Sequence, residues 1–444
     1  MEQRVCVMGA GLVGSMLATR LAQRGFKVDL YERRVDLRKN DISAGRSINL
    51  ALSDRGIRAL EMVGADAKMK EISIPMHGRF LHDIDGNTSI MPYGKEGQFI
   101  NSISRGDLNA HLLDLAEKTG NVTLNFNMPC TDLDLDTGTV TFKNESTGDL
   151  VIKTYDRVFS TDGAFSVGRG KMMKTDRFNY SQYYISSGYK ELSMPPVPGK
   201  KWAIDKDYLH IWPRKDFMLI ALPNQDGSFT CTLFMPFEGK EAAFEKLTSD
   251  KKVTAFFNKY FGDAVPHMSS LIQDWHDNAT SSLVTVKSSP WNYKDKVLLL
   301  GDAAHAIVPF YGQGMNAGFE DVRVFNDFMD DHKDWGDLFN EYSKHRAPDG
   351  QAIADLAINN YTEMRDLVAD PHFVRKRALS GKINDIFPDK WLPLYSMVTF
   401  SHMRYSDALS KGYWQDGVLE KLVAQGIDAN SSLDDIKKGA EMFL

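Results

Sequence analysis

The spacing of apolar residues predicts a parallel α/β sheet in the first part of the chain. An apolar strand at Arg4–Met8 leads into a helix that reaches about Arg24, and a second strand follows at Lys27–Tyr31. The apolar run Val297–Leu300 predicts a further buried strand, and Asp156–Phe159, which leads into Ser160-Thr161-Asp162-Gly163, predicts another. Such short, continuously apolar runs are typical of parallel strands that helices cover on both faces.

The pattern changes between residues 176 and 285, where stretches rich in aromatic and β-branched residues are separated by turns. This pattern predicts an antiparallel sheet with helices packed on it. The expected elements are strands at Tyr183–Lys190, Tyr208–Trp212, Phe217–Leu222 and Phe229–Phe234, and helices at Glu241–Leu247 and Lys252–Phe261. After residue 330 the apolar spacing is helical.

Together these patterns predict an α/β fold in three parts. The expected parts are a Rossmann-like dinucleotide-binding domain formed by residues 1–175 and 286–330, an inserted antiparallel-sheet substrate domain at 176–285, and a C-terminal helical region at 331–444.

The composition is that of an ordinary soluble globular protein, with 444 residues, 43% hydrophobic residues and a net charge of -6. The negative charge argues against nucleic-acid binding, which needs clustered Lys and Arg. The chain enters its first strand at once and has no run of about 18 apolar residues, so we expect neither a signal peptide nor a spanning helix. Three widely spaced cysteines without a metal-binding pattern indicate a reducing, cytoplasmic compartment.

Three glycines after the first strand carry the strongest motif of the chain. Gly9, Gly11 and Gly14 form a GxGxxG pattern between a strand and a helix, and Glu32 ends the second strand. The first glycine permits a tight turn, the second lets a pyrophosphate approach the backbone, and the third lets helix and strand pack closely. Glu32 is placed to accept hydrogen bonds from ribose hydroxyls. The motif predicts an adenine dinucleotide but does not distinguish FAD from NAD.

Basic residues crowd the loop that follows the second strand. Two interpretations remain open for them, a solvated loop or a surface that contacts phosphates of the cofactor or of a pyridine nucleotide. These residues are Arg33, Arg34, Arg38, Lys39 and Arg46.

A second set of residues, far along the chain, predicts the other half of a cofactor site. Gly301-Asp302 places a carboxylate at the end of an apolar strand, and a loop at Gly312-Gln313-Gly314 precedes a helix that begins near Met315. A glycine loop and a helix N-terminus offer backbone N–H groups to a polar or anionic ligand. Asp162-Gly163 supplies another strand end of the same kind.

With these three motifs the chain resembles the FAD-dependent aromatic hydroxylases, the class A flavoprotein monooxygenases. In that family the first motif binds the ADP half of FAD, the Asp-Gly motif is associated with FAD and NAD(P)H binding, and the Gly-Asp motif contacts the ribityl chain. The resemblance implies an FAD-binding domain and NADPH as a transient co-substrate. The cofactor contacts that it implies are Gly9, Gly11, Val13, Gly14, Glu32, Arg33, Ala51, Arg105, Asp162, Asp302, Gly314, Met315 and Asn316.

Longer strings are similar to the branch of this family that hydroxylates L-kynurenine. They include Pro309-Phe310-Tyr311-Gly312-Gln313-Gly314, Asn360-Tyr361-Thr362-Glu363-Met364-Arg365 and Pro393-Leu394-Tyr395-Ser396-Met397-Val398. This similarity implies conversion of L-kynurenine to 3-hydroxykynurenine with NADPH and O2, through a flavin C4a-hydroperoxide, in tryptophan catabolism. The implied substrate contacts are Arg79, Tyr93, Asn360 and Tyr395, with Leu222, Phe234, Pro309 and Met364 around the ring.

The chemistry of kynurenine supports the choice of Arg79. Kynurenine is an amino acid, and the forked guanidinium of arginine can bind a carboxylate through two donors. Arg79 lies in a hairpin predicted at Pro75–Ile90, with a type I′ turn at Asp85-Gly86. The reaction needs no acid–base pair, so we assign no catalytic residue and no metal site, and we expect His305 to be structural.

Three other interpretations remain open. The chain could be a flavin hydroxylase of another aromatic compound such as a phenol or hydroxybenzoate, an NAD-linked dehydrogenase, or a flavin-binding module without catalysis. The glycine-rich segment Gly301–Gly318 argues against the dehydrogenase. The family also leads us to expect a homodimer. Membrane-anchored relatives end in a hydrophobic segment, whereas Val418–Leu444 is polar, so we expect a soluble protein.

Overall fold

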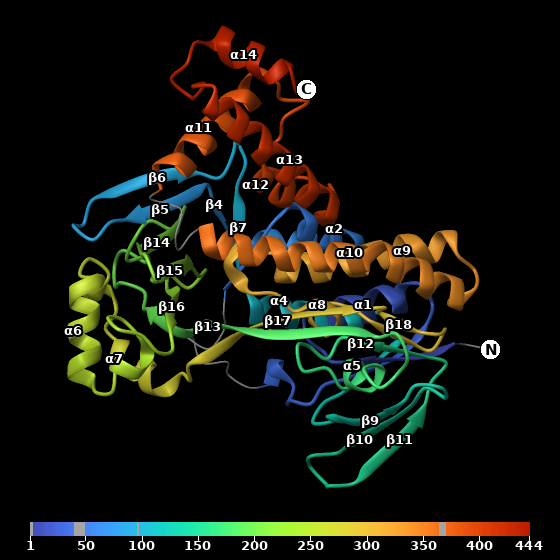
Figure 1. The fold of residues 1–444 in the computed structure, drawn as a ribbon. Helices are drawn as coiled ribbons and strands as arrows, with labels where there is room; N and C mark the ends of the chain where they lie inside the picture. The colour runs from blue at the N-terminus through green and yellow to red at the C-terminus, as the bar shows by residue number, and fades with distance from the viewer. Residues whose placement is uncertain (1–2, 40–48, 96, 364–369) are drawn as a thin grey trace.

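The computed structural model describes residues 3–39, 49–95, 97–363 and 370–444 (Figure 1). The four strands predicted from short apolar runs lie in one six-stranded sheet, so the α/β fold class is confirmed. The strand order is β18 (Asn292–Tyr293), β19 (Val297–Leu299), β12 (Arg157–Ser160), β1 (Arg4–Met8), β2 (Lys27–Tyr31) and β8 (Val122–Asn125). All neighbouring pairs are parallel except β18 and β19.

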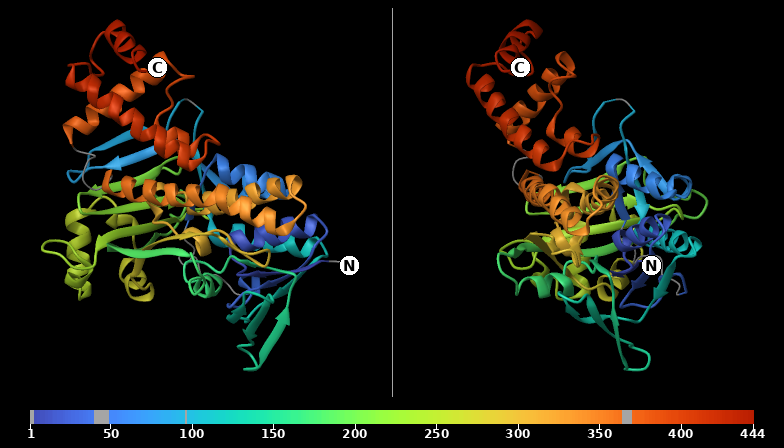
Figure 2. Two further views of the ribbon diagram at one scale, coloured as in Figure 1. Left: turned by 45° about the vertical axis from the view of Figure 1, so that its right-hand side comes forward. Right: turned by 90° about the vertical axis from the view of Figure 1, so that its right-hand side faces the viewer.

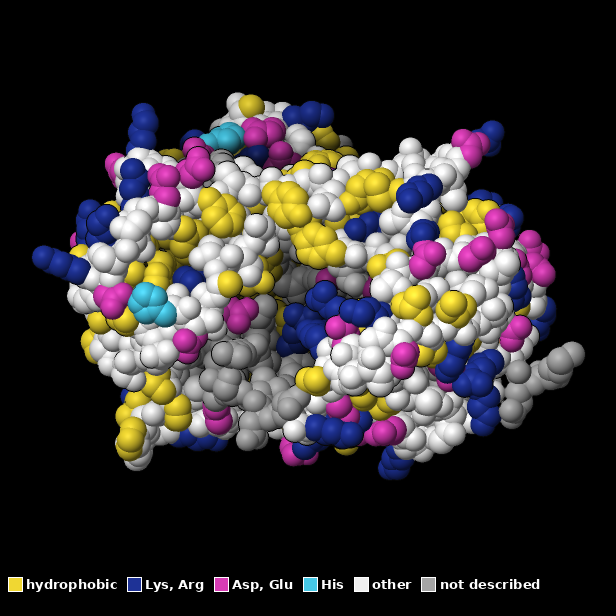
Figure 3. Space-filling model, turned by 90° about the horizontal axis from the view of Figure 1, so that it is seen from below, with side chains coloured by type: hydrophobic (Ala, Val, Ile, Leu, Met, Phe, Trp, Pro, Cys, Tyr) yellow, Lys and Arg dark blue, Asp and Glu magenta, His cyan; other side chains and the backbone are white. Residues whose placement is uncertain are grey.

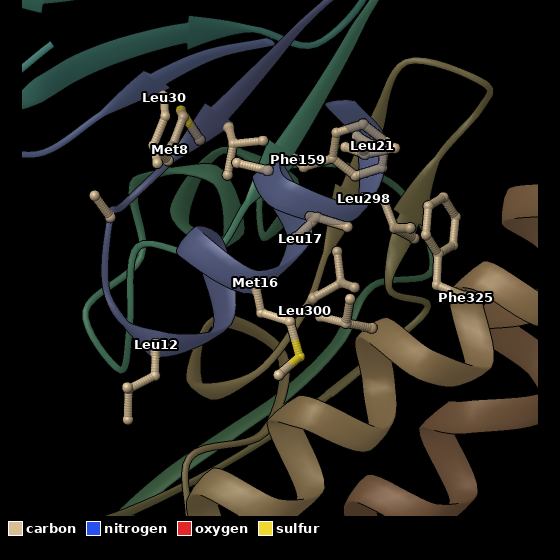
Figure 4. Packing of buried hydrophobic residues seen from close by; sticks show 14 of the residues in the cluster. Met8, Leu12, Met16, Leu17, Leu21, Leu30, Phe159, Leu298, Leu300 and Phe325 are labelled. Carbon is tan, nitrogen blue, oxygen red and sulfur yellow. The ribbon is translucent and has the colours of Figure 1, made fainter. Parts of the chain in front are cut away.

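Helices pack on this sheet through a continuous hydrophobic core. Figure 4 shows Met16 and Leu17 of α1 (Leu12–Gln23) between strand residues such as Leu298 and side chains of α9 (Gly314–Asp331). These side chains are at most 1% exposed, and removing a buried leucine side chain typically costs about 2–5 kcal/mol. The core therefore holds α1 and α9 side by side, although some 300 residues of sequence separate them.

A second, seven-stranded sheet is formed mainly by the middle of the chain. Its strand order is β17 (Ser281–Ser289), β13 (Asn179–Met194), β16 (Phe229–Pro236), β15 (Phe217–Pro223), β14 (Leu209–Arg214), β5 (Gly78–His82) and β6 (Thr88–Pro92). Strand β5 pairs in parallel with β14, with Arg79 opposite Leu209. The predicted hairpin therefore extends this sheet, although it falls within the range 1–175 that we assigned to the dinucleotide-binding domain.

Two local predictions in this region are wrong. The hairpin turn is not type I′. That turn needs a positive φ at both central residues, and Gly86 has a positive φ but Asp85 does not. Instead, Asp83 closes a longer loop by accepting from the backbone N–H groups of Asp85 and Asn87. Segment Glu241–Leu247 is not an α-helix but contains one short 3-10 turn at Phe244–Lys246, because the backbone of Ala243 before it is extended.

Two helices of the middle region, α6 (Asp250–Tyr260) and α7 (Leu271–Asp277), cover one face of the seven-stranded sheet (Figure 1). Two three-stranded sheets complete the strands. They are β11 (Leu150–Thr154), β10 (Thr139–Lys143) and β9 (Cys130–Asp134), and β3 (Asn49–Leu52), β7 (Ile100–Ser104) and β4 (Ser73–Met76).

The C-terminal part is helical, as predicted. The long helix α10 (Trp335–Thr362) runs beside α9, and four further helices gather at one end of the molecule (Figure 2). These are α11 (Pro371–Ile386), α12 (Leu394–Thr399), α13 (Tyr405–Ala424) and α14 (Leu433–Glu441). Among the described residues, no helix is both long and apolar enough to cross a membrane.

Candidate functional site

The GxGxxG turn has the geometry that its three glycines predict. Gly9 has a φ of 96°, and a Cβ on it would lie 2.6 Å from the carbonyl oxygen of Thr161. A Cβ on Gly14 would lie 1.9 Å from the Gly9 oxygen, so this glycine lets α1 approach the turn. A Cβ on Gly11 would meet no atom within 4 Å. The backbone at Gly11 therefore faces open space at the start of α1, where a cofactor pyrophosphate fits.

Glu32 closes this turn from the second strand. Its carboxylate is buried and accepts hydrogen bonds from the backbone N–H of Ala10 (3.0 Å) and from Arg34 (2.8 Å to Nε). Arg33, the neighbouring predicted contact, is exposed. The carboxylate is thus held at the edge of the glycine turn, in the position from which ribose hydroxyls can be bound.

The Asp162-Gly163 pair lies at the end of β12, next to this turn. The Asp162 carboxylate accepts from the hydroxyl of Ser160 and from the backbone N–H of Val167 (2.6 Å), which begins α5 (Val167–Met172). The Asp162 side chain therefore fixes the loop between strand and helix, while Gly163, with a φ of 83°, leaves open space where a Cβ would stand.

Asp302 follows β19 and begins the short helix α8 (Asp302–His305). Its side chain is exposed, yet desolvation by the surrounding protein raises its pKa, against the opposing influence of Arg105 and His305. Such a carboxyl can accept hydrogen bonds from the hydroxyls of a ribityl chain.

The glycine loop before α9 is clamped by Asn316. The buried Asn316 side chain accepts from the backbone N–H of Ser53 (2.9 Å) and donates to the carbonyl oxygens of Ala51 (2.8 Å) and Gly312 (2.9 Å). Its side chain is therefore engaged within the protein. The first turn of α9, from Gly314 through Met315 to Asn316, is left to offer backbone N–H groups to a ligand.

Two small side chains complete the cofactor half. Val13 of α1 packs closely against Gly301 and against Gly318 of α9. A Cβ added to these glycines would lie 3.0 Å and 2.6 Å from the Val13 side chain. Ala51 lies against Gly312, since a Cβ added to Gly312 would lie 3.1 Å from the Ala51 Cβ. Figure 3 shows a hollow near the centre of one face with Lys and Arg side chains gathered beside it, a setting that suits an anionic ligand. Arg46, from the basic loop, lies outside the described residues.

Arg79 lies beside two stacked tyrosines, Tyr93 and Tyr395, whose ring centroids are 5.8 Å apart and which come from distant parts of the sequence. Its guanidinium carbon is 5.5 Å from the ring centroid of Tyr93 and 4.9 Å from that of Tyr395. Burial opposes the charge of Arg79, but Tyr395, Tyr93 and Glu363 outweigh it and raise the pKa of the guanidinium. Arg79 is therefore a stable cation inside a largely desolvated pocket.

The Tyr93 hydroxyl is buried and makes no hydrogen bond of normal geometry to another group among the described residues. Desolvation raises the pKa of this hydroxyl well above its usual value, against the lowering effect of the nearby Arg79 charge, so the hydroxyl keeps its proton and can donate it. A desolvated cation beside an unused buried donor is a site for a carboxylate. Tyr311 of the glycine loop stacks on Tyr395, with centroids 5.6 Å apart, and so links this pocket to the cofactor half.

The remaining predicted substrate residues lie around the same loop. Asn360 donates to the carbonyl oxygen of Phe310 (2.7 Å), and the Phe234 ring lies 5.0 Å from the Phe310 ring. Leu222 is buried in one cluster with Tyr93, and Pro309 is exposed at the start of the loop. Met364 lies outside the described residues.

The sequence did not point to two charged residues at this pocket. Glu363 and Arg377 form an ion pair of 3.2 Å. Desolvation raises the pKa of Glu363 and lowers that of Arg377, and each group interacts with Arg79. No local motif marks such a pair, because its members come from different helical segments and meet only in the folded chain.

Three histidines near the site, His305, His82 and His210, have structural partners. His305 is paired with the buried Asp321 (2.6 Å), which also accepts from Arg346, as expected for a structural residue. His82, the last residue of the strand that carries Arg79, lies between Asp263 (2.7 Å) and His210 (2.9 Å). Among the described residues, no cluster of His, Cys, Asp or Glu could hold a metal ion.

The sequence is similar to those of known proteins. The sequence family described as "FAD binding domain" matches residues 2–357. Kynurenine 3-monooxygenases among the similar proteins include those of Flavobacterium johnsoniae (47% identity, covering 95% of this chain and 94% of the relative) and Sus scrofa (44%, covering 94% and 88%).

Solved structures with a similar fold include 2-methyl-3-hydroxypyridine-5-carboxylic acid oxygenase, with a TM-score of 0.68 at 20% identity over 84% of this chain and 95% of that one. Another is PqsL of P. aeruginosa in complex with 2-aminobenzoylacetate, with a TM-score of 0.65 at 19% identity over 82% and 97%. At these identities the similarity concerns the fold alone.

Proposed function

The chain belongs to the kynurenine 3-monooxygenase family of FAD-dependent enzymes, and from this premise we propose a role for each part of the site. The glycine turns and Asp302 bind FAD, and the pocket around Arg79 binds L-kynurenine. The reaction consumes L-kynurenine, NADPH, a proton and O2, and yields 3-hydroxykynurenine, NADP+ and water. When bound, FAD supplies the chemistry that activates O2 with the electrons of NADPH.

The arrangement of Arg79, Tyr93 and Tyr395 carries the substrate assignment. The guanidinium and the Tyr93 hydroxyl supply donors for the α-carboxylate of an amino acid, and a charge-assisted hydrogen bond of this kind contributes about 1.5–3 kcal/mol. The carboxylate is thereby held on the side of the pocket that Tyr311 joins to the glycine loop. The aromatic ring of the substrate then lies toward the flavin.

Apolar side chains supply the rest of the pocket. Phe234 and Leu222 are almost completely buried and exclude water from the substrate ring. No protein base is needed, because the ring amino group of kynurenine already makes the adjacent carbon electron-rich. The protein thus binds and orients the substrate, and it excludes water.

The test is NADPH oxidation by the purified, FAD-loaded protein with and without L-kynurenine, with the mass of the product recorded. We expect stimulated oxidation and a gain of one oxygen atom. Stimulation with hydrogen peroxide and no hydroxylated product would transfer the assignment to a related aromatic substrate. No stimulation would refute the kynurenine assignment while leaving the FAD site in place.

We also propose a cytoplasmic location, which the bacterial relatives and the three free cysteines support. A homodimer remains a family-based prediction that sedimentation analysis can test.

A further inference from the structure

Arg55 is a buried cation at the place where the cofactor half of the site meets the C-terminal helices. It lies in the first turn of α2 (Asp54–Val63) and is 1% exposed. Its guanidinium donates to the carboxylate of Glu320 on α9 (2.8 Å) and packs 4.1 Å from the ring centroid of Tyr405 on α13. Arg55 thus joins its own helix, α2, to α9 and α13, which lie far apart from it in the sequence.

The same guanidinium holds the backbone of the segment after Tyr395. It donates to the carbonyl oxygens of Val398 (3.0 Å), Met397 (3.2 Å) and Met403. The first two carbonyls belong to the last turn of α12, where a helix leaves its carbonyl groups without intrahelical partners. Arg55 therefore caps α12 from the side, in a buried position that water does not reach.

A lysine could not reproduce these contacts. The guanidinium directs several donors along fixed directions in one plane, whereas an ammonium group is a compact charge on a flexible stem. Lysine could keep the ion pair with Glu320 but could not at the same time serve the three carbonyl groups. The geometry is therefore specific for arginine.

A second set of hydrogen bonds, close to Arg55, ties α13 to the glycine loop and α2 to α9. The Tyr405 hydroxyl donates to the side-chain oxygen of Gln313 in the glycine loop (2.9 Å). Ser53, the residue that caps α2, donates its N–H to Asn316 at the start of α9. The base of α2 is thus fixed to the glycine loop, and the guanidinium two residues later is fixed to α12.

We infer that Arg55 is a positioning residue that keeps Tyr395 in register with the glycine loop. Tyr395 lies in the first turn of α12, and both Arg79 and Tyr311 of the loop lie against its ring. If α12 shifts, the carboxylate pocket moves relative to the flavin. This inference rests on the proposed function, because its effect on turnover requires that kynurenine bind at Arg79.

The test compares the FAD-loaded variants Arg55→Lys and Arg55→Met with a matched control, Arg404→Lys. Arg404 also ties the C-terminal segment to α10, through Asp349 (3.1 Å) and the backbone of His345, but it donates to no α12 carbonyl. We expect the Arg55 variants to retain FAD, to raise the KM for kynurenine about tenfold or more, and to form less product per NADPH consumed. The control should keep the KM and the product yield of the wild type.

Hydrogen–deuterium exchange of the peptide that covers residues 394–403 supplies a measurement independent of the substrate. We expect faster exchange there in both Arg55 variants than in the wild type or the control. Unchanged exchange would overturn the inference, as would a KM and product yield that change equally in Arg55→Lys and Arg404→Lys. A wild-type enzyme that does not hydroxylate kynurenine would refute the proposed function instead, and the exchange measurement would then decide the role of Arg55.

Discussion

Two glycines of the first turn should respond in opposite ways to the addition of one methyl group. In Gly11→Ala the new Cβ meets no protein atom within 4 Å, whereas in Gly14→Ala it would lie 1.9 Å from the Gly9 oxygen. Gly11 also has an extended backbone, with a φ of -74° and a ψ of -175°, which alanine adopts readily. The first variant should therefore fail to bind FAD, and the second should fail to fold normally.

The expected magnitudes follow from these contacts. For Gly11→Ala, the free energy of unfolding of the apoprotein should change by less than about 1 kcal/mol, because only a helix-cap preference is altered. If the methyl group moves the pyrophosphate away from two backbone N–H groups, the loss is about 1.5–3 kcal/mol for each bond, which raises the FAD Kd about 10²- to 10⁴-fold. For Gly14→Ala, the overlap of two backbone segments should cost about 1–3 kcal/mol or more in stability.

The assay combines flavin absorbance per purified protein with urea unfolding of the apoprotein. Wild-type stability with little bound FAD is the expected result for Gly11→Ala, and reduced stability is expected for Gly14→Ala. Full FAD occupancy in Gly11→Ala would refute the placement of the pyrophosphate at this residue. Equal destabilisation of the two variants would show that the open space at Gly11 is absent in solution.

Two further predictions concern the substrate pocket and the pH dependence of stability. Arg79→Lys should keep FAD but raise the KM for kynurenine by about 10- to 100-fold, because lysine keeps the charge and loses one charge-assisted bond of about 1.5–3 kcal/mol. Steady-state kinetics measures the KM, and flavin absorbance per protein shows whether FAD is retained. Burial lowers the pKa of His210 to about 4, so the folded protein binds fewer protons than the unfolded chain between that value and about 6.5. The contribution of His210 to the free energy of unfolding is therefore fully present above about pH 6.5. It is lost as the pH falls toward 4, by up to about 1.4 kcal/mol per pH unit. Urea unfolding of the wild type and of His210→Gln at several pH values should show this difference, and parallel pH profiles of the two would contradict it.

The buried charges around Asp321 should make the structure of the whole site sensitive to acid. Asp321 accepts from His305, from Arg346 and from the backbone N–H of Gly301 (3.0 Å), so a buried carboxylate holds the turn that presents Asp302. Burial alone would raise the pKa of Asp321, but His305 and Arg346 outweigh it and keep the pKa below its usual value. Breaking a buried pair of this kind is strongly destabilising, because it leaves one charge without its partner.

Features that depend on a few neighbouring residues could be predicted from the sequence alone. The turn at Gly9, Gly11 and Gly14 could be predicted because each glycine meets a backbone or packing requirement within one strand, turn and helix. The strands at Arg4–Met8 and Lys27–Tyr31 were predicted with their observed bounds, because they flank the glycine turn and end at Glu32 in the order of the dinucleotide fingerprint. The identity of the substrate residues came from the family resemblance rather than from spacing.

Only the tertiary structure decided which distant residues meet. The pairing of β5 with β14 places Arg79 in the seven-stranded sheet, and the packing of α12 brings Tyr395 to it across more than 300 residues. The contact of Arg55 with the α12 carbonyls and the pairing of Glu363 with Arg377 have no sequence signal. Local periodicity tells which face of an element is buried, but the partner of that face is set by the packing and hydrogen bonding of the whole chain.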